Sequence, residues 1–173
     1  VATNLSNLAG VYKAQGNYAE ALRLYKRALA INEKVFGAEH PKIALNLNNL
    51  AGLYHEQGNY SEALKLYQRA LAIREKALSS EHPDVAISLN NLATLYVQQG
   101  NYQQAIDLQK RALAIREKVF GSEHPDVATS LNNLASAYQE QGNYPEALEL
   151  HQQALSISKA IGNRAVEGEA LHN

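Results

Sequence analysis

Histidine has the widest chemical repertoire in this sequence, because an imidazole can bind a metal and can also transfer protons near neutral pH. Three of the six histidines, His40, His82 and His124, precede a proline and recur at a spacing of 42 residues. None of them shares a predicted helical face with a carboxylate at the spacing that a metal site needs. We therefore expect these histidines to have a structural role before the proline, and we expect no metal site.

Other catalytic arrangements are missing from the sequence as well. It contains no cysteine, no glycine-rich phosphate loop and no Gly-x-Ser-x-Gly turn for a serine nucleophile. The sequence therefore predicts a protein that is not an enzyme and that needs no cofactor.

The charge balance argues against partners that are recognised by electrostatic attraction. The sequence has 173 residues with 16 Lys or Arg and 17 Asp or Glu, which gives a net charge of -1. Nucleic acids and anionic membrane surfaces attract strongly basic proteins. In addition, no apolar run approaches the roughly 18 residues of a membrane span. Neither kind of partner is expected.

Two independent sequence markers repeat with one period. Gln-Gly-Asn-Tyr occurs at 15–18, 57–60, 99–102 and 141–144, and Glu-His-Pro occurs at 39–41, 81–83 and 123–125. The period is 42 residues in every interval. A fixed period of this length indicates an array of repeated supersecondary units.

Apolar residues between the markers follow helical spacing. For example, one face of a helix would carry Leu47, Leu50, Ala51 and Tyr54, which lie at i, i+3, i+4 and i+7. Each repeat is predicted to form a first helix that starts at the proline, a turn at Gly-Asn and a longer second helix. The glycine can adopt the positive φ that ends the first helix, and the asparagine can cap the second.

A single helix pair cannot bury both of its apolar faces, so neighbouring pairs must stack. We therefore predict an all-α fold, an α-α superhelix of antiparallel helix pairs whose inner face is formed mainly by the first helices. The expected repeats span about 1–40, 41–82, 83–124 and 125–162, and 163–173 are expected to start a further repeat. All of them are predicted to form a single array over 1–173.

At these positions the sequence resembles the tetratricopeptide repeat family. The first helix carries the family's Leu-Ala and Tyr, as at Leu50, Ala51 and Tyr54, and the second helix carries its small residues, as at Ala63 and Ala70. The long repeat, with His-Pro-Asp-Val-Ala and Leu-Asn-Asn-Leu-Ala, is similar to the kinesin light chain subtype. The resemblance implies a protein-interaction scaffold with a cargo- or peptide-binding groove, and it does not imply a motor.

Two departures from the family pattern affect the prediction. The usual period of the family is about 34 residues, whereas glutamates stand here where its helix-ending proline would be, so the second helix should be extended. The family's aromatic residue in the second helix is Tyr25 or Tyr67 in the first two repeats, but Gln109 and His151 in the later ones. Looser or wetter packing is expected around those two residues.

Opposite its apolar stripe, each first helix presents a row of residues that no neighbouring helix needs to bury. Asparagine recurs at the same height in all four repeats, beside a small residue, and a carboxamide can both donate to and accept from an extended backbone. We therefore predict a peptide-binding surface formed by Asn7, Asn49, Asn91 and Asn133, by Leu45 and Ile87, by Thr94, Gln98 and Ser136, and by the flanking Asn48, Asn90 and Asn132.

Structural roles are open alternatives for the same residues. Each asparagine could instead bond to a neighbouring helix, and Leu45 and Ile87 could pack against the preceding loop. Lys13 is the only basic residue near the row, so a clamp for a terminal carboxylate is not expected. RNA binding by helical repeats would also need basic residues there, whereas they fall on the second helices, as at Arg69 and Arg111.

The predicted partner is therefore a protein or peptide segment, and neither nucleic acid nor a membrane is expected to bind. A cytoplasmic location is expected with this function. The alternative function is architectural. The array could act as a spacer, or it could self-associate through apolar faces exposed at its ends.

Overall fold

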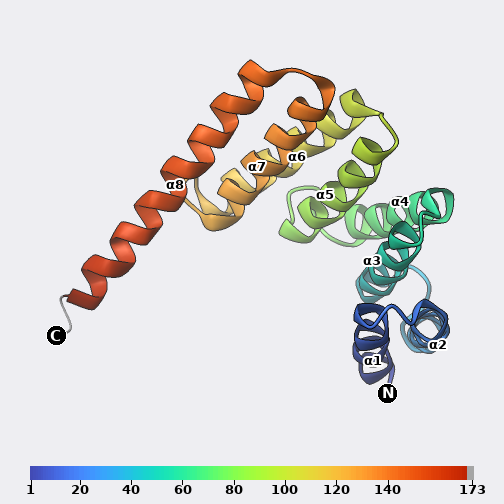
Figure 1. Cartoon of the computed structure of the whole chain (residues 1–173). Coiled ribbons are helices and arrows are strands. Elements are labelled where there is room, and N and C mark those ends of the chain that lie inside the picture. Colours follow the sequence, from blue (N-terminus) through green and yellow to red (C-terminus); the bar gives the residue numbers. More distant parts are fainter. Residues whose placement is uncertain (171–173) are drawn as a thin grey trace. The chain divides into compact units, whose positions relative to one another are not determined.

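A computed structural model describes residues 1–170, with the side chains of residues 1–162, and this part of the chain folds into eight α-helices (Figure 1). Consecutive helices pack as pairs, so the predicted all-α fold of helix pairs is confirmed. None of the described helices is long and apolar enough to cross a membrane. The helices are α1 (Ala2–Ala14), α2 (Tyr18–Phe36), α3 (Pro41–Glu56), α4 (Tyr60–Ala77), α5 (Pro83–Gln98), α6 (Tyr102–Phe120), α7 (Pro125–Gln141) and α8 (Tyr144–Ala170).

Two compact units divide the chain between Ser80 and Glu81. The first unit contains α1 to α4 and the second contains α5 to α8, so each unit consists of two helix pairs. Within the first unit α2 packs on α3, and within the second unit α6 packs on α7. These two junctions bury apolar faces that a single helix pair would leave exposed.

The His-Pro sequence begins α3, α5 and α7. In each of them the histidine is the N-cap and the proline lies in the first turn. The histidine Nδ1 accepts a hydrogen bond from the backbone N–H two residues later, at 3.2 Å for His40 and 3.1 Å for His82 and His124. The predicted structural role of these histidines is confirmed. Two of them also stack on a phenylalanine, His40 on Phe36 and His124 on Phe120, with ring centroids 4.9 and 4.5 Å apart.

The turns inside the helix pairs follow the predicted pattern with one exception. The four turn glycines have φ between 73° and 88°. Asn17 and Asn59 cap α2 and α4 by accepting a hydrogen bond from the backbone N–H three residues later. Asn101 forms no such bond at the start of α6, so the predicted cap is wrong there.

The second helices are extended, as predicted. α2 and α6 have 19 residues each, and α4 has 18. α8 continues without a break through Ala170. The further repeat expected at 163–173 falls on residues whose side chains lie outside the described part of the chain, and residues 171–173 lie wholly outside it, so the further repeat stays a prediction.

Replacing a capping histidine by alanine should destabilise the array. His82→Ala removes the acceptor for the Asp84 N–H, which should cost about 1 kcal/mol. His124→Ala should cost up to about 1 kcal/mol more, because it also removes the stack on Phe120. Urea unfolding followed by circular dichroism would measure both losses. His82→Asn restores a capping oxygen and should stay close to the parent, so equal losses for His82→Ala and His82→Asn would contradict this explanation.

Candidate functional site

The predicted row of first-helix residues lies on the surface of both units. In the first unit Asn7 and Leu45 are exposed and Asn49 is half-buried. In the second unit Ile87 is exposed and Asn91 is half-buried. The exposed fractions of the two apolar side chains are 57% for Leu45 and 41% for Ile87. Neither side chain is therefore packed away against a loop.

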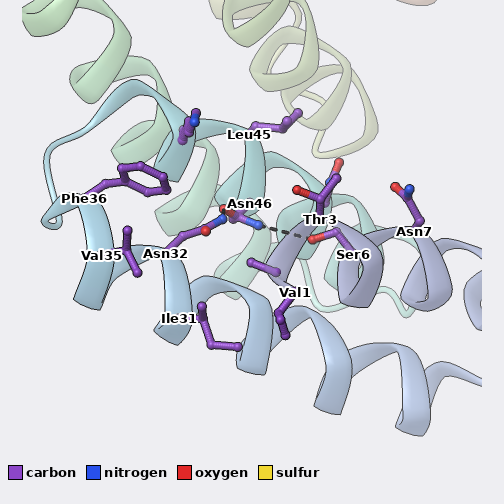
Figure 2. Close-up of a pocket in the computed structure, with 13 residues that line it drawn as sticks. Val1, Thr3, Ser6, Asn7, Ile31, Asn32, Val35, Phe36, Leu45 and Asn46 are labelled. Atoms are coloured by element: carbon purple, nitrogen blue, oxygen red, sulfur yellow. Dashed lines mark hydrogen bonds between the residues drawn. The ribbon is translucent and has the colours of Figure 1, made fainter.

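A pocket of about 450 Å³ lies in the first unit, between α1, the end of α2 and the start of α3 (Figure 2). Three of its lining residues, Asn7, Leu45 and Asn49, belong to the predicted row. Val35 and Phe36 add apolar surface from the end of α2 that the sequence analysis did not assign to the site. The available signal was a Val-Phe pair at a helix end, which recurs at 119–120.

A chain of hydrogen bonds joins three helices at this pocket. Asn32 Nδ2 on α2 donates to Asn46 Oδ1 on α3 at 2.7 Å, and Asn46 Nδ2 donates to Ser6 Oγ on α1 at 3.3 Å (Figure 2). Asn46 is buried, with an exposed fraction of 5%. Lys42 carries the only charged side chain among the lining residues, and its Nζ lies 4.4 Å from the centre of the Phe36 ring.

The second unit has a different pair at the equivalent positions, two repeats later in the sequence. Arg116 stands where the first unit has Asn32, and Ser130 stands where it has Asn46. Arg116 Nη1 donates to Ser130 Oγ at 2.6 Å and to the backbone oxygen of Asp126 at 3.3 Å. The guanidinium therefore bridges α6 and α7, whereas the shorter Asn32 leaves room beside the amides of the first unit.

The asparagines of the predicted row differ in their bonding. The carboxamides of Asn49 and Asn91 form no hydrogen bond with any residue in the described part of the chain. Asn133 Nδ2 donates to Asn90 Oδ1 on the neighbouring first helix at 2.6 Å. Of these three asparagines, only Asn133 has the structural role that was considered as an alternative.

The flanking asparagines connect the first helix to the second helix of the same pair. Asn90 Oδ1 also accepts from Gln109 Nε2 at 3.1 Å, and Asn132 Oδ1 lies 2.8 Å from His151 Nδ1. Gln109 has an exposed fraction of 3%. The expectation of looser or wetter packing at Gln109 is therefore wrong, because the amide replaces the lost aromatic contact with a buried hydrogen bond. Asn48 is buried, and its Oδ1 has no partner among the described residues.

The small residues of the row depend on what the second helix carries. A Cβ added at Gly10 would lie 3.6 Å from the Tyr25 hydroxyl, and one added at Gly52 would lie 3.6 Å from the Tyr67 hydroxyl. In the second unit, where the aromatic is replaced, the row has hydroxyl residues instead of glycine. Their Oγ atoms bond to the backbone oxygen four residues earlier, and the residues are Thr94 and Ser136. Gln98 at the end of α5 is exposed.

The charges near the row of the first unit are already paired. Lys13 Nζ on α1 lies 2.8 Å from Glu56 Oε1 on α3, with both side chains partly exposed. Burial raises the pKa of Tyr67 to about 12, and the Glu56 carboxylate adds to this shift. Burial also raises the pKa of Tyr25, where the charge of Lys13 opposes the shift. Lys13 is therefore engaged by Glu56 and is not an open clamp for a carboxylate.

Comparison with known proteins identifies the repeat. A family model described as Tetratricopeptide repeat matches residues 1–76, 46–118 and 84–160. The chain belongs to the tetratricopeptide repeat family. Tetratricopeptide repeats are typically non-catalytic scaffolds for protein–protein interactions. None of the curated proteins compared with this tetratricopeptide array matches it.

Solved structures with similar repeats extend this result. Two crystal structures from Podosopora anserina, described as a kinesin light chain with nearly identical TPR-like repeats, are 35% and 36% identical to the tetratricopeptide array. They match 94% and 92% of the array and 76% of their own chains, with TM-scores of 0.81 and 0.77. BtubC (BKLC) from P. vanneervenii is 28% identical over 93% of the array and 64% of its own chain, with a TM-score of 0.84. The repeats are therefore of the kinesin light chain type.

The stability of the tetratricopeptide array should fall at high pH because of Tyr67. The pKa of this tyrosine is about 12 in the folded array, above the value of about 10 in an unfolded chain. Its contribution is therefore fully present below pH 10 and is lost as the pH rises towards 12, by up to about 1 kcal/mol per pH unit. Urea unfolding at pH 9 and pH 11 should show a smaller loss in Tyr67→Phe than in the parent. An equal loss in both proteins would contradict the prediction.

Proposed function

We propose that the array is a protein-interaction scaffold that holds an extended peptide segment on the first-helix surface. The observation that carries this proposal is the state of Asn49 and Asn91. Both carboxamides are half-buried, and neither has a hydrogen-bond partner in the described part of the chain. A partly desolvated amide without a partner is unfavourable. A bound backbone would supply both an acceptor and a donor for each amide, whatever the side chains of the ligand.

The pocket of the first unit supports the proposal in a second way. Asn49 is one of its lining residues, so a backbone bonded to this amide can direct a side chain into the pocket. Its apolar walls include Val35, Phe36 and Leu45, and no acidic side chain lines it. Such a pocket suits an uncharged, apolar side chain. Membership of a family whose repeats are typically interaction scaffolds also supports the proposal.

Removing the two free amides should weaken peptide binding and leave the fold intact. Peptides selected against the array from a random displayed library would serve as probes. Asn49→Ala with Asn91→Ala should lower their affinity roughly 5- to 100-fold, since each hydrogen bond contributes about 0.5–1.5 kcal/mol. The melting temperature should not fall, because neither amide has a partner to lose. Gln68→Ala with Gln104→Ala removes two exposed amides from the second helices and should bind like the parent. Unchanged affinity in the asparagine variant would rule out this binding mode.

Closing the pocket should change which peptides are selected. Asn32→Arg with Asn46→Ser gives the first unit the pair that the second unit already has, so the variant is expected to fold with nearly the parent's stability. The arginine should fill the pocket, and peptides selected against this variant should lose a recurring apolar residue that parent-selected peptides carry. Asn46→Ser alone interrupts the hydrogen-bond chain without filling the pocket and is the control. Identical selected sequences for the parent and the double variant would show that the pocket is not used.

Self-association is a second candidate function, and exposed apolar side chains on the terminal helices favour it. Leu8 and Val11 on α1 have exposed fractions of 45% and 54%. Leu148 and Leu155 on α8 have exposed fractions of 60% and 53%. Large apolar side chains clustered on one helix face are typical of surfaces that bind another protein.

A further inference from the structure

The exposed face of α1 repeats a face that is buried elsewhere in the same chain. One repeat later, Leu8 and Val11 correspond to Leu50 and Leu53 on α3. Leu50 and Leu53 are buried, with exposed fractions of 3% and 0%, in a cluster that α2 covers. The face of α1 therefore has the composition of a surface that accepts a second helix, and in the described part of the chain no second helix covers it.

The exposed face of α8 is the other half of the same contact. Three repeats earlier, Leu148 and Leu155 correspond to Leu22 and Leu29 on α2. Leu22 and Leu29 are partly buried because they pack against the cluster that contains Leu50 and Leu53.

The second unit repeats this contact with other side chains. At the corresponding positions of α6 and α7, one cluster contains Ile106, Leu113, Leu134 and Ala137. The same pair of faces thus forms both junctions, and it tolerates changes in side-chain size.

From this correspondence we infer that a second copy of the chain docks head to tail, with α8 of one copy covering α1 of the next. The inference rests on self-association as a function and names its surfaces and polarity. A second copy is the occupant because the two faces already meet within the chain, at α2 on α3 and at α6 on α7, so the contact continues an interface that the fold contains. Each copy keeps one free α1 and one free α8, so such a heterologous contact does not stop at a dimer unless a ring closes.

Charge gives this arrangement a defined register. Across the junction inside the first unit, Arg69 Nη2 lies 2.8 Å from Glu33 Oε1. The corresponding residues in the docked copies are Arg27 of one and Lys159 of the other, so two like charges would face each other. A partly exposed charge pair has a small effect compared with the burial of four large apolar side chains. The like charges should therefore weaken the contact without preventing it.

Complementation between two variants tests the polarity. Leu8→Glu with Val11→Glu blocks the α1 face, and Leu148→Glu with Leu155→Glu blocks the α8 face. Because these four positions are exposed, both variants should fold, which thermal melting followed by circular dichroism would check. In sedimentation equilibrium the parent should grow beyond a dimer from micromolar to millimolar concentrations. Each variant alone should be a monomer, and an equimolar mixture should form a one-to-one dimer and nothing larger.

Several outcomes would overturn the inference. A parent that stays monomeric at millimolar concentration would remove self-association altogether. A parent that associates while the mixed variants do not complement would place the contact on other surfaces, so self-association would survive and the head-to-tail arrangement would not. Neither outcome affects peptide binding by Asn49 and Asn91, whose test uses separate variants.

A single charge change tests the register. Lys159→Glu should recreate the ion pair seen between Arg69 and Glu33 and should tighten self-association roughly 2- to 10-fold at low salt. The gain should shrink as salt is added. Lys65→Glu makes the same change in net charge on α4, away from the terminal helices, and should give no gain. Equal affinities for Lys159→Glu and Lys65→Glu would overturn the proposed contact.

Discussion

A pair of antiparallel helices with apolar residues on both sides can bury only one side by itself, and the other must be covered by a neighbouring pair. In this chain the α2–α3 and α6–α7 junctions provide that cover, with side chains such as Leu50, Leu53 and Leu134 almost completely buried. Because the apolar sides face neighbouring helices, the opposite side of each first helix can stay polar. The row that contains Asn49 and Asn91 exists for this reason.

Features that depend on neighbours in the sequence could be predicted from it. The 42-residue period, the His-Pro helix starts and the turn glycines all follow from local rules, and the structure bears them out. The row of asparagines could also be placed, because helical geometry fixes which residues share a face. What the wheel could not supply was the bonding of each amide. Asn133 bonds across to Asn90, whereas the amide of Asn91 has no partner in the described part of the chain.

The pocket and the polar pairs could not be predicted, because they depend on contacts between helices. Asn32 and Asn46 belong to different repeats, and only the packing of α2 on α3 brings their amides to 2.7 Å. The change from tyrosine to Gln109 appeared in the sequence as a loss of packing. The structure shows instead that Gln109 is buried and bonded to Asn90. A periodic alignment identifies equivalent positions, but the chemistry at each position depends on the partner that it meets.

The two kinds of polar pair limit how the repeats could be exchanged by recombination. A crossover in a Glu-His-Pro loop would keep Asn90 with Gln109, which lie in one repeat, but would part Arg116 from Ser130, which lie in successive repeats. A crossover at a Gly-Asn turn would do the reverse. No single cut point preserves both contacts. Duplicated segments of this gene are therefore less interchangeable than their sequence similarity implies, and a chimaera would need compensating changes on one side of its seam.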